Sequence, residues 1–296
     1  MATIQTLDLE YGERGTIAAY LVESAGHLAL VETGPDSTYP HLVAELARLS
    51  VRPSDVRDVL VTHIHLDHAG AAWRLAREGA TVHVHPRGAA HLADPGKLLA
   101  SARRIYRERM DELWGTLEPI AHEKLKVTAD GSSITVGATA ISVLETPGHA
   151  IHHNTYLVDG CAFTGDVGGV ALGGGPVLPP TPPPDIDLEQ WDASIARLRA
   201  ARPDALYPTH FGRHDGVDGT LDELSAELHA WAGWVRERLA EGKDEAAIVP
   251  EFEEWLVERL LARGVAPGAV AAYRIALPFA MNVTGLVRYW RRAETA

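Results

Sequence analysis

The sequence predicts a mixed α/β (α+β) domain followed by a small helical domain. Short apolar runs typical of strands alternate with helical periods up to about residue 85, and strand patterns return between residues 133 and 164. After about residue 219, every periodic segment has the period of a helix. We therefore expect residues 1–216 to form the α/β domain and residues 217–296 to form the helical C-terminal domain.

Apolar alternation and turn residues predict the elements of the first domain. Strands are expected at 16–22, 27–32, 59–62 and 81–85, and again at 133–136, 139–144, 154–158, 161–164 and 206–208. Helices are expected at 41–49, 69–77 and 187–200, the last one capped by Asp187. The Gly- and Pro-rich segment 173–184 can be neither a helix nor an inner strand.

Two further regions are predicted to be helical. Residues 86–117 have the pattern of an inserted helical arm, which is either a lid or a surface helix pair that packs its own apolar side. In the C-terminal domain we expect helices at 221–239, 245–261 and 266–292.

Composition narrows the classes of partner and compartment. The chain has 296 residues, 46% of them hydrophobic, and a net charge of −13, which argues against nucleic acid as the main partner. The single cysteine, Cys161, excludes a disulfide within the chain and fits a reducing compartment. The N-terminus lacks a signal-peptide pattern and no apolar run approaches 18 residues, so we expect a cytoplasmic protein without a membrane span.

The segment Val61–Gly70 contains three imidazoles and one carboxylate within six residues. A strand places residues i and i+2 on one face, so His63 and His65 can converge, and the turn that follows can direct Asp67 and His68 to a neighbouring point. Roughly 2 in 1000 chains of this composition would contain such a run by chance. Imidazole and carboxylate together suit Zn²⁺, and also Fe or Mn.

Three more potential ligands each follow a predicted strand. His149 ends Thr146-Pro147-Gly148-His149, Asp166 follows Gly165, and His210 follows the short strand at 206–208. Because the ends of neighbouring strands can meet at one sheet edge, these side chains can share a cleft with the histidine run.

Over residues 3–215 the sequence resembles the metallo-β-lactamase superfamily, whose pattern is H-x-H-x-D-H followed by His, Asp and His. The resemblance implies an αββα sandwich with two divalent metal ions at one edge of the sheets, with Zn²⁺ as the first choice. It implies that one metal is held by His63, His65 and His149, that the other is held by Asp67, His68 and His210, and that Asp166 bridges them.

Four other residues are candidates for the surroundings of these ligands. The family usually has Asp-Thr-Gly where this chain has Glu32-Thr33-Gly34, so Glu32 is expected to orient a ligand or the turn. His152 or His153 could face the cleft as a substrate contact or a proton shuttle, and His214 could do the same. Tyr207 could direct its hydroxyl at a substrate or serve in packing.

The resemblance implies a dinuclear hydrolase in which a metal-bridging hydroxide attacks a small acyl substrate, a thioester or a lactone. Asp67 and Asp166 would be catalytic as ligands that orient the hydroxide. The helical C-terminal region is similar to that of glyoxalase II-like hydrolases, and with the arm it would form the substrate wall. The partner is then a small molecule, and the oligomeric state stays open, with a homodimer as one option.

Three alternatives remain. The first is an iron-dependent oxidoreductase of the same fold, similar to persulfide dioxygenases. The second is a phosphodiesterase or nuclease, which the acidic balance disfavours. The third is a binding protein that kept the fold without catalysis.

Overall fold

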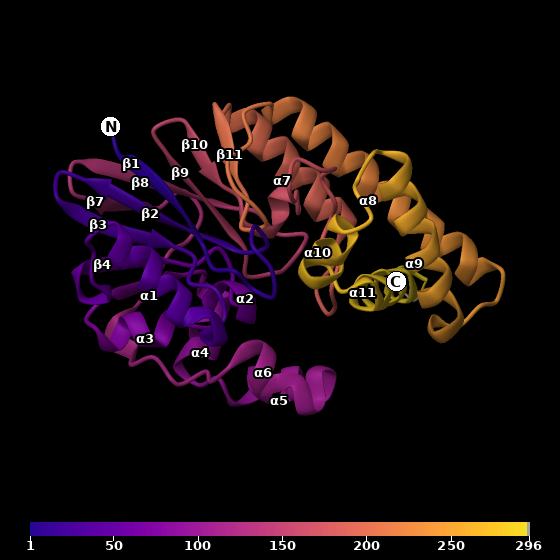
Figure 1. The fold of residues 1–296 in the computed structure, drawn as a ribbon, viewed down its shortest axis with the longest axis horizontal. Coiled ribbons are helices and arrows are strands. Elements are labelled where there is room, and N and C mark those ends of the chain that lie inside the picture. The colour runs from indigo at the N-terminus through magenta and orange to yellow at the C-terminus, as the bar shows by residue number, and fades with distance from the viewer. Residues whose placement is uncertain (295–296) are drawn as a thin grey trace.

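Two β-sheets packed face to face form the body of the protein, and the computed structural model describes residues 1–294 of it (Figure 1). The six-stranded sheet has the order β1-β2-β3-β4-β5-β6, with bounds β1 Thr3–Asp8, β2 Ala18–Ser24, β3 His27–Val31, β4 Val56–Leu60, β5 Thr81–Val84 and β6 Leu125–Val127. The five-stranded sheet has the order β11-β10-β9-β8-β7, with bounds β11 Ala205–Tyr207, β10 Cys161–Phe163, β9 Asn154–Val158, β8 Thr139–Glu145 and β7 Ser133–Val136.

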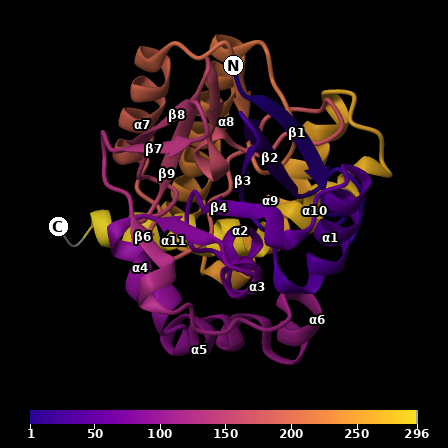
Figure 2. The ribbon, with the colours of Figure 1, turned by 90° about the vertical axis from the view of Figure 1, so that its left-hand side faces the viewer.

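Helices cover both outer faces of this pair of sheets. The facing sides share one buried cluster, in which Tyr20 from one sheet packs against Phe163 and Tyr207 from the other. The six-stranded sheet is covered by α1 (Tyr39–Arg48) and α3 (Ala72–Arg77), and the five-stranded sheet by α7 (Leu188–Ala201) and α8 (Val217–Ala240) (Figures 1 and 2). The predicted αββα sandwich with a helical C-terminal region is therefore confirmed.

The segment predicted as a helical arm is helical and projects from the sandwich (Figure 2). Its helices are α4 (Pro86–Ala93), α5 (Gly96–Tyr106) and α6 (Met110–Trp114). The end of the arm is tied to the body through Asp36, whose carboxylate accepts from Thr116 N at 2.9 Å, and through Trp73, whose indole N–H donates to Thr116 O at 2.9 Å. The arm therefore returns to a fixed point on the sandwich.

The C-terminal helices are α8, α9 (Glu245–Ala262), α10 (Ala269–Ala276) and α11 (Phe279–Ala293). The single helix expected at 266–292 is broken, because Pro278 cannot continue α10 and instead opens α11. One hydrophobic cluster joins these helices to α7, with Trp231 and Phe252 on one side and Trp191 on the other. Residues 295–296 of the predicted domain lie outside the described residues.

Within residues 1–294, no single helix has the length and apolar character needed to cross a membrane. The pair α10 and α11, bent by 46° at its break, passes that test by length and composition.

Two strands had no clear signal in the sequence. β1 has the polar sequence TIQTLD, with Leu7 as its one buried residue, so apolar alternation is nearly absent. β6 is three residues long and its Val127 is exposed. Both strands lie at the edges of the six-stranded sheet, where pairing rather than burial defines the strand.

Candidate metal centre

The histidine run lies immediately after β4, an inner strand, and so at the C-terminal end of that strand in the six-stranded sheet. His63 follows the strand, His65 is the N-cap of α2 (Leu66–Ala69), and Asp67 and His68 lie in this short helix. Thr33, after β3, holds α2 in place, since its backbone N–H and its hydroxyl donate to His68 O at 2.8 and 2.9 Å. The local turn predicted from the sequence therefore exists and is anchored to the neighbouring strand.

His149, Asp166 and His210 follow β8, β10 and β11, and glycines make room for the first two. Gly148 has φ +131°, and a β-carbon there would lie 2.4 Å from Trp191 Cα. Gly165 has φ +49°, and a β-carbon there would lie 2.5 Å from Thr62 Oγ1. A glycine before each ligand thus allows the backbone an approach that any side chain would block.

The first group of side chains consists of His63, His65, His149 and Asp166, whose nearest nitrogen and oxygen atoms all lie within 4.8 Å of one another. His65 Nδ1 lies 2.9 Å from His63 Nε2 and 3.0 Å from His149 Nε2. Asp166 Oδ2 lies 3.3 Å from His149 Nε2. Three ring nitrogens thus converge on one point with a carboxylate oxygen beside them.

The second group consists of Asp67, His68 and His210, and Asp166 connects it to the first. Asp67 Oδ2 lies 3.6 Å from His68 Nε2 and 3.5 Å from His210 Nε2. The other Asp166 oxygen, Oδ1, lies 3.2 Å from His68 Nε2 and 3.6 Å from His210 Nε2. Asp166 therefore presents one carboxylate oxygen to each group.

Backbone carbonyls orient two of the imidazoles from behind. His149 Nδ1 donates to Pro180 O at 2.8 Å, and His210 Nδ1 donates to Thr16 O at 2.7 Å. This leaves the lone pair of each Nε2 directed at the centre, which is the arrangement in which histidine binds metals.

Glu32 lies behind His68 and is completely buried. Its Oε1 lies 3.3 Å from His68 Nδ1 and accepts hydrogen bonds from the Thr62 and Thr209 hydroxyls. The Glu32 carboxylate therefore lies directly behind the His68 ring, and its role in orienting this residue stays a prediction.

The protonation of the centre follows from burial and from the neighbouring charges. Burial and the surrounding imidazoles hold the pKa of His63 well below its usual range, so this ring is neutral. Burial opposes a charge on His68, but Asp166, Asp67 and Glu32 together raise its pKa well above its usual range. A cationic group at this point is therefore favoured by three nearby carboxylates.

The residues present fit a bound metal. His68 Nε2 and Asp166 Oδ1 are buried without a hydrogen-bond partner among the described residues. His65 Nδ1 lies in contact with both His63 Nε2 and His149 Nε2. A single proton can serve only one of these two contacts, so in the other contact two nitrogen lone pairs face each other. Metal cations shared by these atoms would satisfy them, and the donor set of nitrogen and carboxylate oxygen suits Zn²⁺, Fe or Mn.

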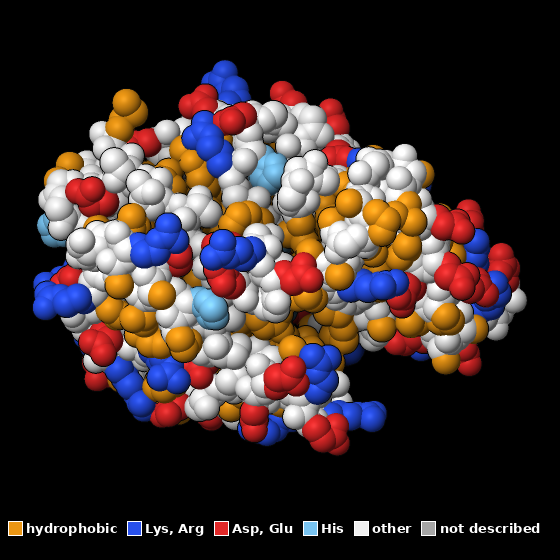
Figure 3. All heavy atoms as spheres, viewed as in Figure 1, with side chains coloured by type: hydrophobic (Ala, Val, Ile, Leu, Met, Phe, Trp, Pro, Cys, Tyr) orange, Lys and Arg blue, Asp and Glu red, His pale blue; other side chains and the backbone are white. Residues whose placement is uncertain are grey.

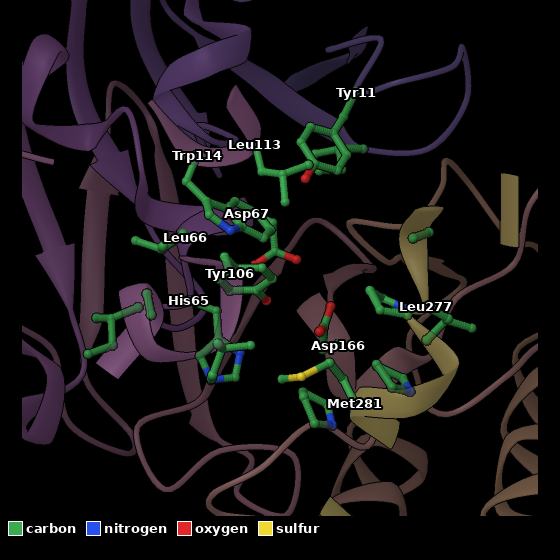
Figure 4. Close-up of a pocket in the computed structure, with 18 of the residues that line it drawn as sticks. Tyr11, His65, Leu66, Asp67, Tyr106, Leu113, Trp114, Asp166, Leu277 and Met281 are labelled. Carbon is green, nitrogen blue, oxygen red and sulfur yellow. The ribbon is translucent and has the colours of Figure 1, made fainter. Parts of the chain in front are cut away.

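A cavity of about 1060 Å³ opens over the centre, and His65, Asp67, Asp166 and His210 lie in its lining (Figure 4). The other walls come from the loop after β1, from the arm, and from the corner between α10 and α11. Hydrophobic side chains gather around the hollow between the sandwich, the arm and the C-terminal helices (Figure 3). A ligand in this cavity would therefore contact the centre, the arm and the C-terminal helices together.

The remaining candidates divide between the centre and other places. His153 is buried against the ring of His63, and its Nδ1 contacts Thr146 Oγ1 at 2.9 Å, whereas His152 lines the cavity. The turn sequence alone could not distinguish these two histidines.

Tyr207 and His214 lie away from the cavity. The Tyr207 ring packs in the core between the sheets, and its hydroxyl accepts from Arg213 Nη1 at 3.0 Å. His214 Nε2 contacts Phe211 O at 3.1 Å. The hypothesis that these two residues contact the substrate is therefore not supported by their positions.

Known proteins resemble the chain over the region that builds this centre. A family model described as the metallo-beta-lactamase superfamily matches residues 12–210. A metallo-beta-lactamase fold-containing protein of Sulfurisphaera tokodaii, ST1585, is 29% identical over 158 residues, 52% of this chain and 60% of that protein. A hydroxyacylglutathione hydrolase of Fuscovulum blasticum is 31% identical over 208 residues, 69% of this chain and 64% of that enzyme. The matches thus span less than two thirds of both relatives.

The solved structure of ST1585, an archaeal metallo-beta-lactamase superfamily protein, superposes with a TM-score of 0.71 at 22% identity, covering 97% of this chain and 99% of that one. Fold and centre together define an αββα protein with a metal-fitting His/Asp set at the sheet edge. The chain belongs to the metallo-beta-lactamase superfamily, as its histidine pattern predicted.

Proposed function

We propose that the protein is a dinuclear metal-dependent hydrolase of a small acyl substrate, with a thioester as the preferred class. One observation carries this proposal: two groups of ligand side chains share Asp166, and both lie at the floor of one cavity. Most of these side chains are buried, while His65 and Asp67 are partly exposed to the cavity. The similarity to an enzyme named hydroxyacylglutathione hydrolase supports a hydrolytic reaction.

In this proposal His63, His65 and His149 would hold one metal ion and Asp67, His68 and His210 a second, with Asp166 a ligand available to both groups. Zn²⁺ is our first choice, with Fe or Mn as alternatives. The metals, when bound, would supply the Lewis acidity that polarises an acyl carbonyl and lowers the pKa of water.

The protein's own groups then bind and orient the reactants. Asp67 is 22% exposed and faces the cavity, so its carboxylate can accept a hydrogen bond from a water beside the acyl carbon. The Pro180 and Thr16 carbonyls orient the rings of His149 and His210, and the Glu32 carboxylate lies 3.3 Å behind His68 Nδ1. The single cysteine lies on β10 outside the cavity lining and has no part in this reaction.

A small molecule fits this site better than a nucleic acid does. Aromatic and aliphatic side chains form much of the cavity lining, and the net charge of −13 disfavours a phosphate backbone as the main partner. Charged side chains also line the cavity, among them Arg87, Lys97 and Arg109. A cytoplasmic location and a possible homodimer remain predictions from the sequence.

The test is a substrate panel measured on protein with defined metal content. Protein purified without added metal is analysed for Zn, Mn and Fe, then assayed with acyl thioesters, lactones, phosphodiesters and single-stranded RNA before and after chelation. We expect thioester hydrolysis that chelation removes and Zn²⁺ restores. Hydrolysis confined to lactones would move the substrate class to the second candidate.

Two results would contradict the proposal. Abundant iron with oxygen consumption and no hydrolysis would favour the oxidoreductase of the same fold. Cleavage of phosphodiesters or RNA alone would favour the nuclease.

A further inference from the structure

Three aromatic rings form one wall of the cavity. Tyr11, from the loop after β1, stacks on Trp114 with ring centroids 5.6 Å apart and an interplanar angle of 19°. Tyr106, at the end of α5, meets the same indole edge-on at 5.0 Å. All three residues line the cavity, and Figure 4 shows them on the same side of it as Asp67. We refer to Tyr11, Tyr106 and Trp114 as the aromatic wall.

The chain that carries Trp114 is anchored to the sandwich. Ser37 Oγ donates to Leu113 O at 2.6 Å, immediately before Trp114. The next residue, Gly115, has φ +68°, and a β-carbon there would lie 2.8 Å from Ser37 N. The chain carrying Trp114 therefore packs backbone to backbone against the sandwich, so that binding costs little ordering of this wall.

The side opposite the aromatic wall is apolar as well. Leu277 and Met281, at the corner between α10 and α11, face the cavity across from Tyr106 and Trp114, with the Asp166 carboxylate in the space between them (Figure 4). Leu66, beside His65 and Asp67, completes an apolar surface close to the reactive centre. Polar groups such as Lys97 and Arg109 line the same cavity, so the apolar surface is the part of it formed by Leu66, Leu277 and Met281. An apolar acyl group gains most from burial against this part.

Exposed apolar side chains extend this surface toward the opening. Ile105 on α5 is 44% exposed and Ile151, after His149, is 38% exposed, and both line the cavity. Large apolar residues exposed at one concave site, and contributed by separate segments, indicate a surface that binds an apolar partner.

Two hydroxyl groups at the aromatic wall have no assigned role in the fold. Neither the Tyr11 nor the Tyr106 hydroxyl makes a hydrogen bond to another residue in the described part of the chain. Burial first and then the Asp67 charge raise the pKa of both, so they stay protonated and remain donors. A donor beside Asp67 can bind the oxygen of an acyl carbonyl.

We propose that this cavity is an acyl pocket for a large apolar acyl group, either medium-chain or aromatic. The inference rests on the proposed hydrolase function and narrows its substrate class. Water adds to the acyl carbon, the carbon–sulfur bond breaks, and the sulfur takes a proton, giving a carboxylic acid and a thiol. The acid product retains the apolar group, so the binding affinity of the product acid measures how well the pocket accepts that group.

Binding of product acids tests the pocket without catalysis. Calorimetric titration of the zinc-loaded protein with acetate, butyrate, hexanoate and octanoate compares ligands that share one head group. We expect the association constant to rise by about three- to fourfold per added methylene, as burial in an apolar site requires. Equal affinity along this series would overturn the proposal.

A matched pair of substitutions locates the effect. Ile105→Glu places a charge in the cavity at a 44% exposed position of α5, and Leu261→Glu makes the same change at a 43% exposed position of α9 outside the cavity lining. We expect Ile105→Glu to lower octanoate affinity at least tenfold and to leave acetate affinity unchanged, with Leu261→Glu without effect on either. Equal effects of the two substitutions would contradict the assignment.

The same acids as thioesters separate this inference from the proposed function. Chain-length-dependent binding with no hydrolysis of thioesters or lactones would support the pocket and refute the hydrolase. If the protein hydrolyses thioesters but neither product binding nor kcat/KM depends on chain length, the pocket is refuted and the hydrolase proposal stands.

Discussion

The metal centre and the aromatic wall face the same cavity but are built in opposite ways. The side chains of the centre follow strand ends or lie in and beside the short helix α2, and backbone carbonyls orient two of them, His149 and His210. The aromatic wall comes from a loop and from the inserted arm; ring contacts join its residues, and only the chain beside Trp114 is anchored to the sandwich. In the two proposals, the sheet edge would supply the chemistry and the added segments would supply the choice of substrate.

The largest expected effect is on the centre itself. His65 Nδ1 contacts both His63 Nε2 and His149 Nε2. His65→Ala therefore removes the nitrogen at the middle of the first group. We expect kcat/KM to fall by about 10³-fold or more, with lower metal content by elemental analysis.

His214→Ala is the control for this substitution, because His214 lies away from the cavity. It should retain both metal and activity. Full metal occupancy and activity in His65→Ala would remove the centre from the mechanism.

The centre could be predicted from sequence because its pattern is local. Strand alternation pairs His63 with His65, and a turn after an apolar strand marks His149 and Asp166. Glu32 was found by its departure from a short motif, and the structure places it beside His68.

The cavity could not be predicted in the same way. Tyr11 and Met281 show no pattern in the sequence that connects them, and they meet only because the loop after β1 and the corner between α10 and α11 pack around one space. That corner exists because Pro278 interrupts a helical period that otherwise appears continuous. Conversely, Tyr207 is the last residue of β11, three residues before His210, yet its ring lies in the core between the sheets.

The next largest expected effect is a loss of stability when a side chain is added at Gly165, where the backbone packs closely against the centre. Gly165→Ala places a β-carbon 2.5 Å from Thr62 Oγ1 and 2.7 Å from His153 Nε2 at a φ of +49°. We expect the free energy of unfolding to fall by about 2–4 kcal/mol, from strain and overpacking together. Denaturant unfolding measures it.

Gly233→Ala provides the matched control, because Gly233 lies within α8 with nothing within 4 Å of a β-carbon. There the same change should stabilise the protein by about 0.5–1 kcal/mol. Similar effects at both positions would mean that room beside Asp166 does not matter.

Glu32 tests whether the residue behind a ligand matters as much as the ligand. Glu32→Gln keeps the size but removes the charge that faces His68. We expect metal affinity to fall by about 10- to 100-fold in a competition titration with a chelator. Glu32→Asp keeps the charge on a shorter side chain and should retain more affinity than Glu32→Gln, and the reverse order would show that length matters more than charge.

The smallest expected effect tests whether the C-terminal helices influence the metal centre. Asn282 on α11 is buried, and its Oδ1 accepts from Thr181 N at 2.5 Å, next to the Pro180 carbonyl that orients His149. Asn282→Ala leaves the Thr181 N–H unpaired, which costs about 1–3 kcal/mol, and it frees the loop behind His149.

We expect Asn282→Ala to lower metal affinity severalfold, although Asn282 is not a ligand. Thr284→Ala is the control on the same helix, because Thr284 Oγ1 donates to Ala280 O and Glu245 and has no hydrogen bond to the loop. If Asn282→Ala lowers stability but leaves metal affinity unchanged, the C-terminal helices shape the cavity without acting on the centre. If affinity falls in Asn282→Ala alone, the helices that select the substrate also position a metal ligand.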